Sequence, residues 1–87
     1  IAEDIATLAR GEIDLAKSAS NGYSRNFKLP TKVEGNSYTI VIIDDRELVV
    51  DYIDKEYVSF LPEDVEGSIN PGENTIKKES GTVYVNT

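Results

Sequence analysis

The first twenty residues carry an apolar stripe with helical periodicity, and this stripe constrains the fold more than any other feature of the chain. At about 100° per residue, one side of a helix over residues 1–20 collects the apolar side chains Ile1, Ile5, Leu8, Ala9, Ile13, Leu15, Ala16 and Ala19. Charged and hydroxyl side chains occupy the other side, and only Glu12 falls within the stripe. Asn21-Gly22 then ends the pattern, because glycine just past a helix adopts a left-handed conformation without a steric clash. The sequence therefore predicts an amphipathic helix that buries one side.

The periodic pattern is already in register at Ile1, and no capping residue stands ahead of it. We therefore expect residues 1–21 to be the distal part of a longer N-terminal helix. The 87 residues are enough for one modest core. The sequence thus predicts a single domain over residues 1–87, in which residues 22–87 form a β domain.

Short runs with strand periodicity fill the rest of the chain. They cover residues 23–29, 38–43, 46–53, 57–61, 74–78 and 82–86, whereas residues 63–69 fit either a short edge strand or a loop. Residues 38–43 are apolar or β-branched on both faces, which predicts a central place in the sheet. We expect an α+β fold, in which the N-terminal amphipathic helix packs on an antiparallel β-sheet of about five to six short strands.

Composition removes several classes of function. The chain has no Cys and no His, so it lacks thiolate ligands, the commonest zinc ligand and the usual general base at neutral pH. Its 16 acidic and 9 basic residues give a net charge of −7, whereas phosphate binding needs clustered Lys and Arg. No nucleophile–base pair, phosphate loop or metal motif is present. We expect no enzymatic activity, no cofactor, no metal and no nucleic-acid partner.

Two turns are candidate exposed contact loops. The first is the hairpin turn Asp44-Asp45, and the second is Asn70-Pro71-Gly72-Glu73, in which Pro and Gly suit the second and third positions of a turn. Carboxylates near the first turn offer oxygen ligands for Ca²⁺. The sequence lacks an Asp-x-Asp-x-Asp-Gly loop, and turns commonly hold acidic residues, so the solvated-turn interpretation is preferred.

The order of these features resembles a known family. A helix runs into Asn21-Gly22-Tyr23, and the next strand ends in Leu29-Pro30. The motif Tyr-x-Ile-x-Ile follows from Tyr38, and the chain closes on Lys-x-x-Ser-Gly-Thr-Val-Tyr-Val from Lys77. This pattern resembles the globular part of archaeal type IV pilin-like proteins, the class with a short class III signal peptide in methanogens.

The resemblance implies a structural subunit of a surface filament. The precursor would carry a basic leader and about 20 apolar residues ahead of Ile1, enough to cross a bilayer, and a prepilin peptidase would cleave the leader. The partners would be other pilin subunits, in a homopolymer or as a minor subunit. Only that missing segment would contact the membrane. Because the same segment drives polymerisation, residues 1–87 alone are expected to be monomeric. The helix residues expected to serve assembly and packing are Ile1, Ala2, Ile5, Leu8, Ala9, Ile13 and Ala16.

Two classes of function therefore stay open. One is a structural subunit of an extracellular, cell-surface type IV pilus-like filament that serves adhesion. The other is a stand-alone extracellular binding, adhesin or inhibitor domain that makes its contacts through the two candidate loops.

Overall fold

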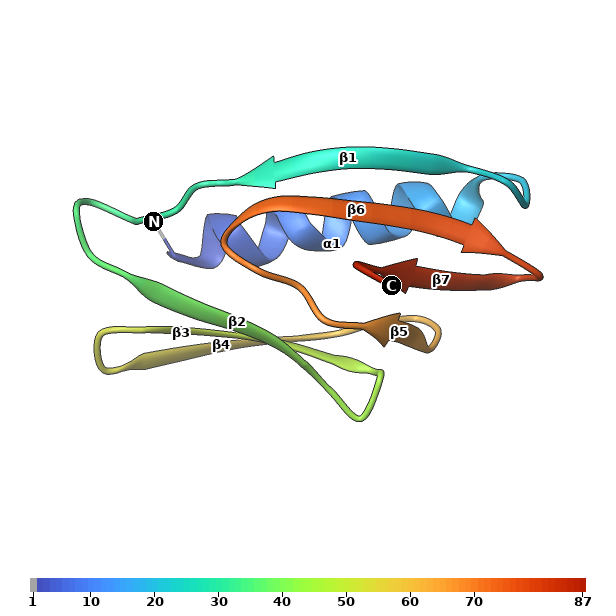
Figure 1. Ribbon diagram of the computed structural model, residues 1–87. Helices are drawn as coiled ribbons and strands as arrows, with labels where there is room; N and C mark the ends of the chain where they lie inside the picture. Colours follow the sequence, from blue (N-terminus) through green and yellow to red (C-terminus); the bar gives the residue numbers. More distant parts are fainter. Residues whose placement is uncertain (1) are drawn as a thin grey trace.

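The computed structural model describes residues 2–87 and consists of one helix and seven strands (Figure 1). The elements are α1 (Ala2–Ser18), β1 (Ser24–Leu29), β2 (Tyr38–Ile43), β3 (Glu47–Tyr52), β4 (Lys55–Phe60), β5 (Val65–Gly67), β6 (Gly72–Glu79) and β7 (Thr82–Val85). The strands form two sheets, one in the order β1-β6-β7-β5 and one in the order β2-β3-β4.

The predicted fold, one antiparallel sheet of five to six strands packed on a helix, is wrong. Seven strands divide between two sheets, so the chain is richer in β-structure than a pilin-like α+β fold. The four-stranded sheet is also not purely antiparallel, because β5 lies parallel to β7. The difference arises from a distant pairing. β1 pairs with β6 in a register that sets Ser24 opposite Lys77, and this pairing separates β1 from the hairpins that follow it.

The expected central place of residues 38–43 is also wrong. β2 is an edge strand of the three-stranded sheet, and β3 is the central one. The segment 63–69 contains the short edge strand β5. The expected turn at residues 70–73 is shorter than predicted, because β6 begins at Gly72.

α1 packs against both sheets and contacts β3 and β4 of one sheet and β1, β6 and β7 of the other (Figure 1). Ile5, Ala9, Ile13 and Ala16 are buried on its inner side. The largest fully buried side chains come from the helix, both sheets and the connection after β4: Ile13, Leu29, Leu48, Leu61, Ile76, Val50, Val65 and Val85. The helix is thus the element that both sheets share.

Side chains from the four-stranded sheet fix the helix in place. The Lys78 ammonium donates hydrogen bonds to the carbonyl oxygens of Lys17, at 2.6 Å, and Ala19, at 3.0 Å. The last carbonyls of a helix have no partner within the helix, and a cation there complements the helix dipole. Arg25 on β1 forms an ion pair with Glu12, with 3.0 Å between Nε and Oε1. The one charged residue within the predicted stripe therefore lies beside a cation.

No helix among residues 2–87 combines the length and the apolar character that crossing a bilayer requires.

Candidate binding surface

The three-stranded sheet has two faces of different chemistry. Leu48, Val50 and Tyr52 of β3 are buried on the face turned toward α1. The opposite face, called the outer face, consists of three rows of residues that the strand register sets directly opposite one another. The rows are Thr39–Asp51–Glu56, Val41–Val49–Val58 and Ile43–Glu47–Phe60.

The outer face is apolar at its centre, and the apolar residues on either side of the centre are open to solvent. Val49 is only 4% exposed, because Val41 and Val58 flank it in the same row. Those two valines are 43% and 46% exposed, and in the next row Ile43 is 43% and Phe60 67% exposed. Contiguous exposed apolar residues on a folded domain mark interaction sites, whereas scattered ones need no explanation. The outer face is therefore the candidate binding surface.

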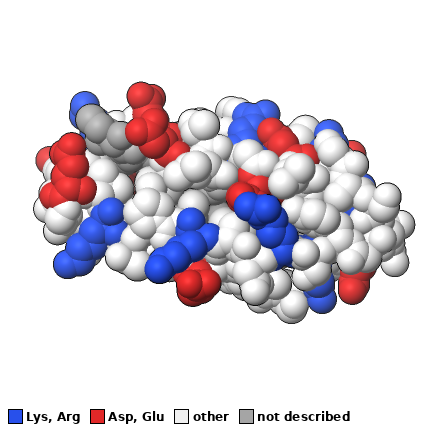
Figure 2. Space-filling model, turned by 90° about the horizontal axis from the view of Figure 1, so that it is seen from above, with Lys and Arg blue, Asp and Glu red and all other residues white. Residues whose placement is uncertain are grey.

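The segment 44–66, which contains two of the three strands of this sheet, carries the whole net charge of the protein. Residues 44–66 contain nine acidic and two basic side chains, whereas the rest of the chain contains seven of each. The nine acidic residues are Asp44, Asp45, Glu47, Asp51, Asp54, Glu56, Glu63, Asp64 and Glu66. By contrast, acidic and basic side chains mix on the face that is seen from the side of β1 (Figure 2). The outer face is thus an apolar surface in a strongly negative field.

Acidic side chains on the outer face lack cationic partners. Asp51 and Glu56 lie directly opposite each other across β3 and β4. The ion pairs between described residues involve neither of them, nor Glu47. Like charges that face each other across a strand pair are destabilising. A cation from a partner would relieve this repulsion.

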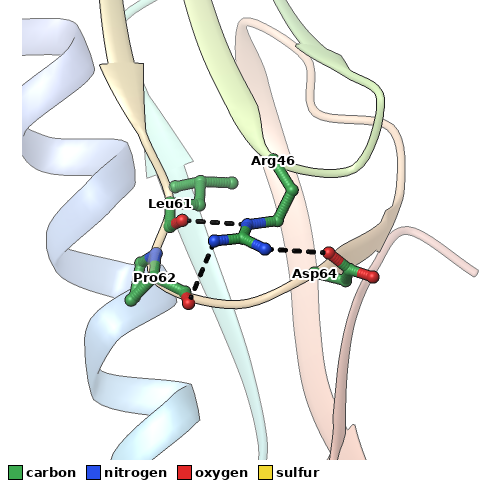
Figure 3. A network of polar contacts seen from close by, with 4 residues as sticks. All are labelled: Arg46, Leu61, Pro62 and Asp64. Carbon is green, nitrogen blue, oxygen red and sulfur yellow. Dashed lines mark hydrogen bonds and ion pairs between the residues drawn. The ribbon is translucent and has the colours of Figure 1, made fainter.

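The structure places the first predicted loop, Asp44-Asp45, at the end of the β2–β3 hairpin. Both residues are exposed and have positive φ, at 52° and 61°. The neighbouring Arg46 holds the turn against the segment that follows β4 (Figure 3). Its Nε donates to the Leu61 carbonyl at 3.1 Å, and its guanidinium lies 3.6 Å from the Asp64 carboxylate. The loop is therefore an anchored border of the outer face.

The second predicted loop lies at the start of β6 in the four-stranded sheet. Asn74, which is buried, accepts a hydrogen bond from the Asn70 N–H at 2.9 Å and donates to the Asn70 carbonyl at 2.8 Å. Gly72 is buried, and Glu73 belongs to β6, where it lies opposite Lys28. Only Asn70 and Pro71 remain as exposed loop residues outside a strand. The two predicted loops thus belong to different sheets.

The predicted helix residues divide between the core and the surface. Ile5, Ala9, Ile13 and Ala16 belong to the core, and Ala2 begins α1, whereas Ile1 lies outside the described residues. Leu8 is 53% exposed and Leu15 is 49% exposed. Gly11 lies between them, and a Cβ atom at that position would meet no other atom within 4 Å. Leu8, Gly11 and Leu15, called the helix stripe, form a second exposed surface.

A groove of about 650 Å³ runs between α1 and β4. Arg10 crosses it, donating a hydrogen bond to the Ser59 hydroxyl at 2.9 Å and lying 3.7 Å from the Asp14 carboxylate. Arg10 therefore connects Asp14 on the helix with Ser59 on β4 across this groove. Among residues 2–87, no group of three or more acidic side chains is arranged to hold a metal ion.

No protein-family model, curated protein or solved structure matches this chain.

Sequence reasoning missed the apolar residues of the outer face, which are Val41, Ile43, Val58 and Phe60. A signal for Val41 and Ile43 was present, because residues 38–43 are apolar or β-branched on both faces of a strand. That pattern indicates either a strand covered on both sides or an edge strand with an uncovered apolar face. The structure shows the second arrangement.

Proposed function

We propose that this domain is a non-catalytic protein-binding module. Its outer face would take a partner that presents apolar side chains bordered by Lys or Arg. The observation that carries the proposal is the apolar row Val41–Val49–Val58, whose two outer valines are exposed, beside carboxylates of the segment 44–66 that holds the whole net charge. This function belongs to the binding-domain class considered above, but its contacts lie on a sheet face rather than on two turns.

The two chemistries of the outer face support different parts of binding. Removing the exposed parts of the valines and Phe60 from water supplies affinity at about 25 cal/mol per Å² of apolar area. The acidic residues steer a basic partner toward the surface and disfavour an acidic one. Asp51 and Glu56 gain most from a cation, because they already repel each other.

Site-specific photo-crosslinking tests this proposal. A photoreactive amino acid replaces Val58 on the outer face, and the matched control carries it at Thr75, an exposed position on β6 of the other sheet. We expect cross-links from position 58 to peptides of another protein that are rich in apolar and basic residues, and few from position 75. Equal yields at both positions would contradict the proposal, as would cross-links from position 58 to a second copy of this chain.

The helix stripe favours a second candidate, a subunit of a cell-surface filament that assembles through α1. Leu8 and Leu15 are seven residues apart and lie on one side of the helix, and Gly11 between them allows another helix to approach closely. We expect an antibody against the domain to label surface filaments of the source cells, and Leu8→Asp to prevent incorporation while Thr7→Asp does not. Labelling confined to material outside filaments would exclude this candidate.

A further inference from the structure

The open edge of β2 differs from every other edge strand of the described chain. β1 carries Arg25 and Lys28, β4 carries Lys55 and Glu56, and the short β5 carries Glu66. β2, with the sequence Tyr-Thr-Ile-Val-Ile-Ile, has no charged residue, no Pro and no Gly. Proteins usually protect an exposed edge strand with charges, Pro, a bulge or short length. β2 has none of these protections.

The backbone N–H and C=O groups along the open edge of β2 form no backbone hydrogen bonds to other described segments. Within residues 2–87, β2 pairs only with β3. Exposed edges of this kind accept an extended peptide as an additional strand, with main-chain hydrogen bonds giving affinity and alternate side chains giving specificity. We propose that an extended segment of the partner, carrying Lys or Arg, adds to β2 as a fourth strand. This inference rests on the proposed binding function.

Charge decides between the possible occupants of this edge. A second copy of this chain would bring another net charge of −7 to the same place, and the repulsion would oppose pairing. A basic segment would instead be attracted by the carboxylates of residues 44–66. The occupant is therefore a segment of opposite charge.

The register of the sheet specifies which side chain of the added strand goes where. A residue opposite Thr39 extends the row Thr39–Asp51–Glu56, and the small threonine allows a long basic side chain to reach toward Asp51 across about 10 Å, two strand spacings. Residues opposite Val41 and Ile43 extend rows with exposed apolar side chains. The expected ligand therefore has a basic residue and two apolar residues at alternate positions.

A designed peptide and its backbone-methylated versions test strand addition. The probe is a short capped peptide in which threonine alternates with isoleucine, valine and lysine, in that order, so that an antiparallel strand sets the lysine opposite Thr39. One methylated version carries N-methyl groups on the threonines, and the other carries them on the residues between. Alternate residues of a strand direct their N–H groups to opposite sides, so only one of the two sets faces β2.

We expect saturable binding of the probe by titration calorimetry, and slower hydrogen exchange of the β2 amides in the complex. One methylated version should bind at least tenfold more weakly, the other should bind like the probe, and a glutamate-for-lysine version should not bind. Equal affinity of both methylated versions would overturn strand addition, and so would the absence of binding by the probe. Cross-links from position 58 to a basic partner would still stand in either case, so the two proposals fail separately.

Discussion

Asp51 and Glu56 face each other directly across β3 and β4, and neither carboxylate forms an ion pair with a described residue. The pair lies on the outer face, in the row next to the exposed valines. Two like charges in this position weaken the sheet that carries them. The arrangement fits a surface that a cationic partner stabilises when it binds.

Replacing one member of this pair reports on the repulsion. We expect Glu56→Lys to raise the free energy of unfolding by about 0.5–1 kcal/mol, because repulsion becomes attraction across the strands. Urea unfolding at low ionic strength measures the change. Glu63→Lys changes the net charge equally in an exposed segment outside the strands, so it should have a smaller effect. Equal stabilisation by the two variants would show that the net charge, rather than the pair, matters.

The contact between Lys78 and the end of α1 gives a second prediction. Lys78→Met removes two charge-assisted hydrogen bonds to helix carbonyls, and we expect a cost of about 1 kcal/mol, because the site is only half-buried. The neighbouring Lys77 makes an ion pair at 4.0 Å with Glu79 and lies 5.8 Å from the Tyr84 ring. Lys77→Met should therefore cost less than about 0.5 kcal/mol. Chemical denaturation of both variants makes the comparison, and equal losses would rule out this role of Lys78.

Arg46 anchors the border of the outer face through a planar group with several donors (Figure 3). Lysine keeps the charge but cannot contact the Leu61 and Pro62 carbonyls and Asp64 together. We expect Arg46→Lys to cost about 1 kcal/mol. Arg25→Lys, at a position where one ion pair is made, should cost less than about 0.5 kcal/mol. Thermal unfolding of the two variants measures these losses. Melting temperatures equal to that of the parent for both variants would contradict this account.

Tyr38 should make stability depend on pH in the alkaline range. Burial raises the pKa of its phenol above the ordinary value of 10.0, and its hydroxyl donates a hydrogen bond to the Pro30 carbonyl. Its contribution to stability is fully present below the unfolded-state pKa. It is lost as pH rises through the higher folded-state pKa, because the unfolded chain releases the proton first.

We therefore expect the stability of the parent protein to fall more steeply above pH 10 than that of Tyr38→Phe. The variant should be less stable by about 1 kcal/mol at neutral pH, where the hydrogen bond is lost. Urea unfolding across the pH range measures both effects. Parallel pH profiles for the two proteins would exclude a contribution from Tyr38.

The periodicity of apolar residues predicted the positions of the helix and of strands such as β2 well, because helical and strand periods depend on residues that are close in sequence. The helical period located α1 and assigned Ile13 to its inner side, and the strand period located β2 within its observed bounds. The limits of the buried stripe depend on packing instead. Leu8 and Leu15 lie on its flank, where the positions of the sheets decide exposure.

The division into two sheets could not be read from the chain in the same way. Hairpins join strands that are adjacent in sequence, but β1 pairs with β6, and four strands lie between them in the chain. The parallel pairing of β5 with β7 follows from the same distant contact. Periodicity indicates that residues 38–43 have two apolar faces, but it does not show what covers them. For this reason the candidate surface emerged only from the structure.

Mapping the probe peptide onto the protein by NMR tests the central claim most directly. Backbone and methyl shifts of the isotopically labelled domain are followed as the lysine-containing peptide is added. Addition of the peptide to β2 beside the outer face predicts that the largest changes fall on the amides of residues 38–43 and on the methyl groups of Val41 and Ile43, with smaller changes at Val49. These changes should vanish when glutamate replaces lysine in the peptide. Changes that centre on Leu8 and Leu15, or that spread evenly over both sheets, would contradict it.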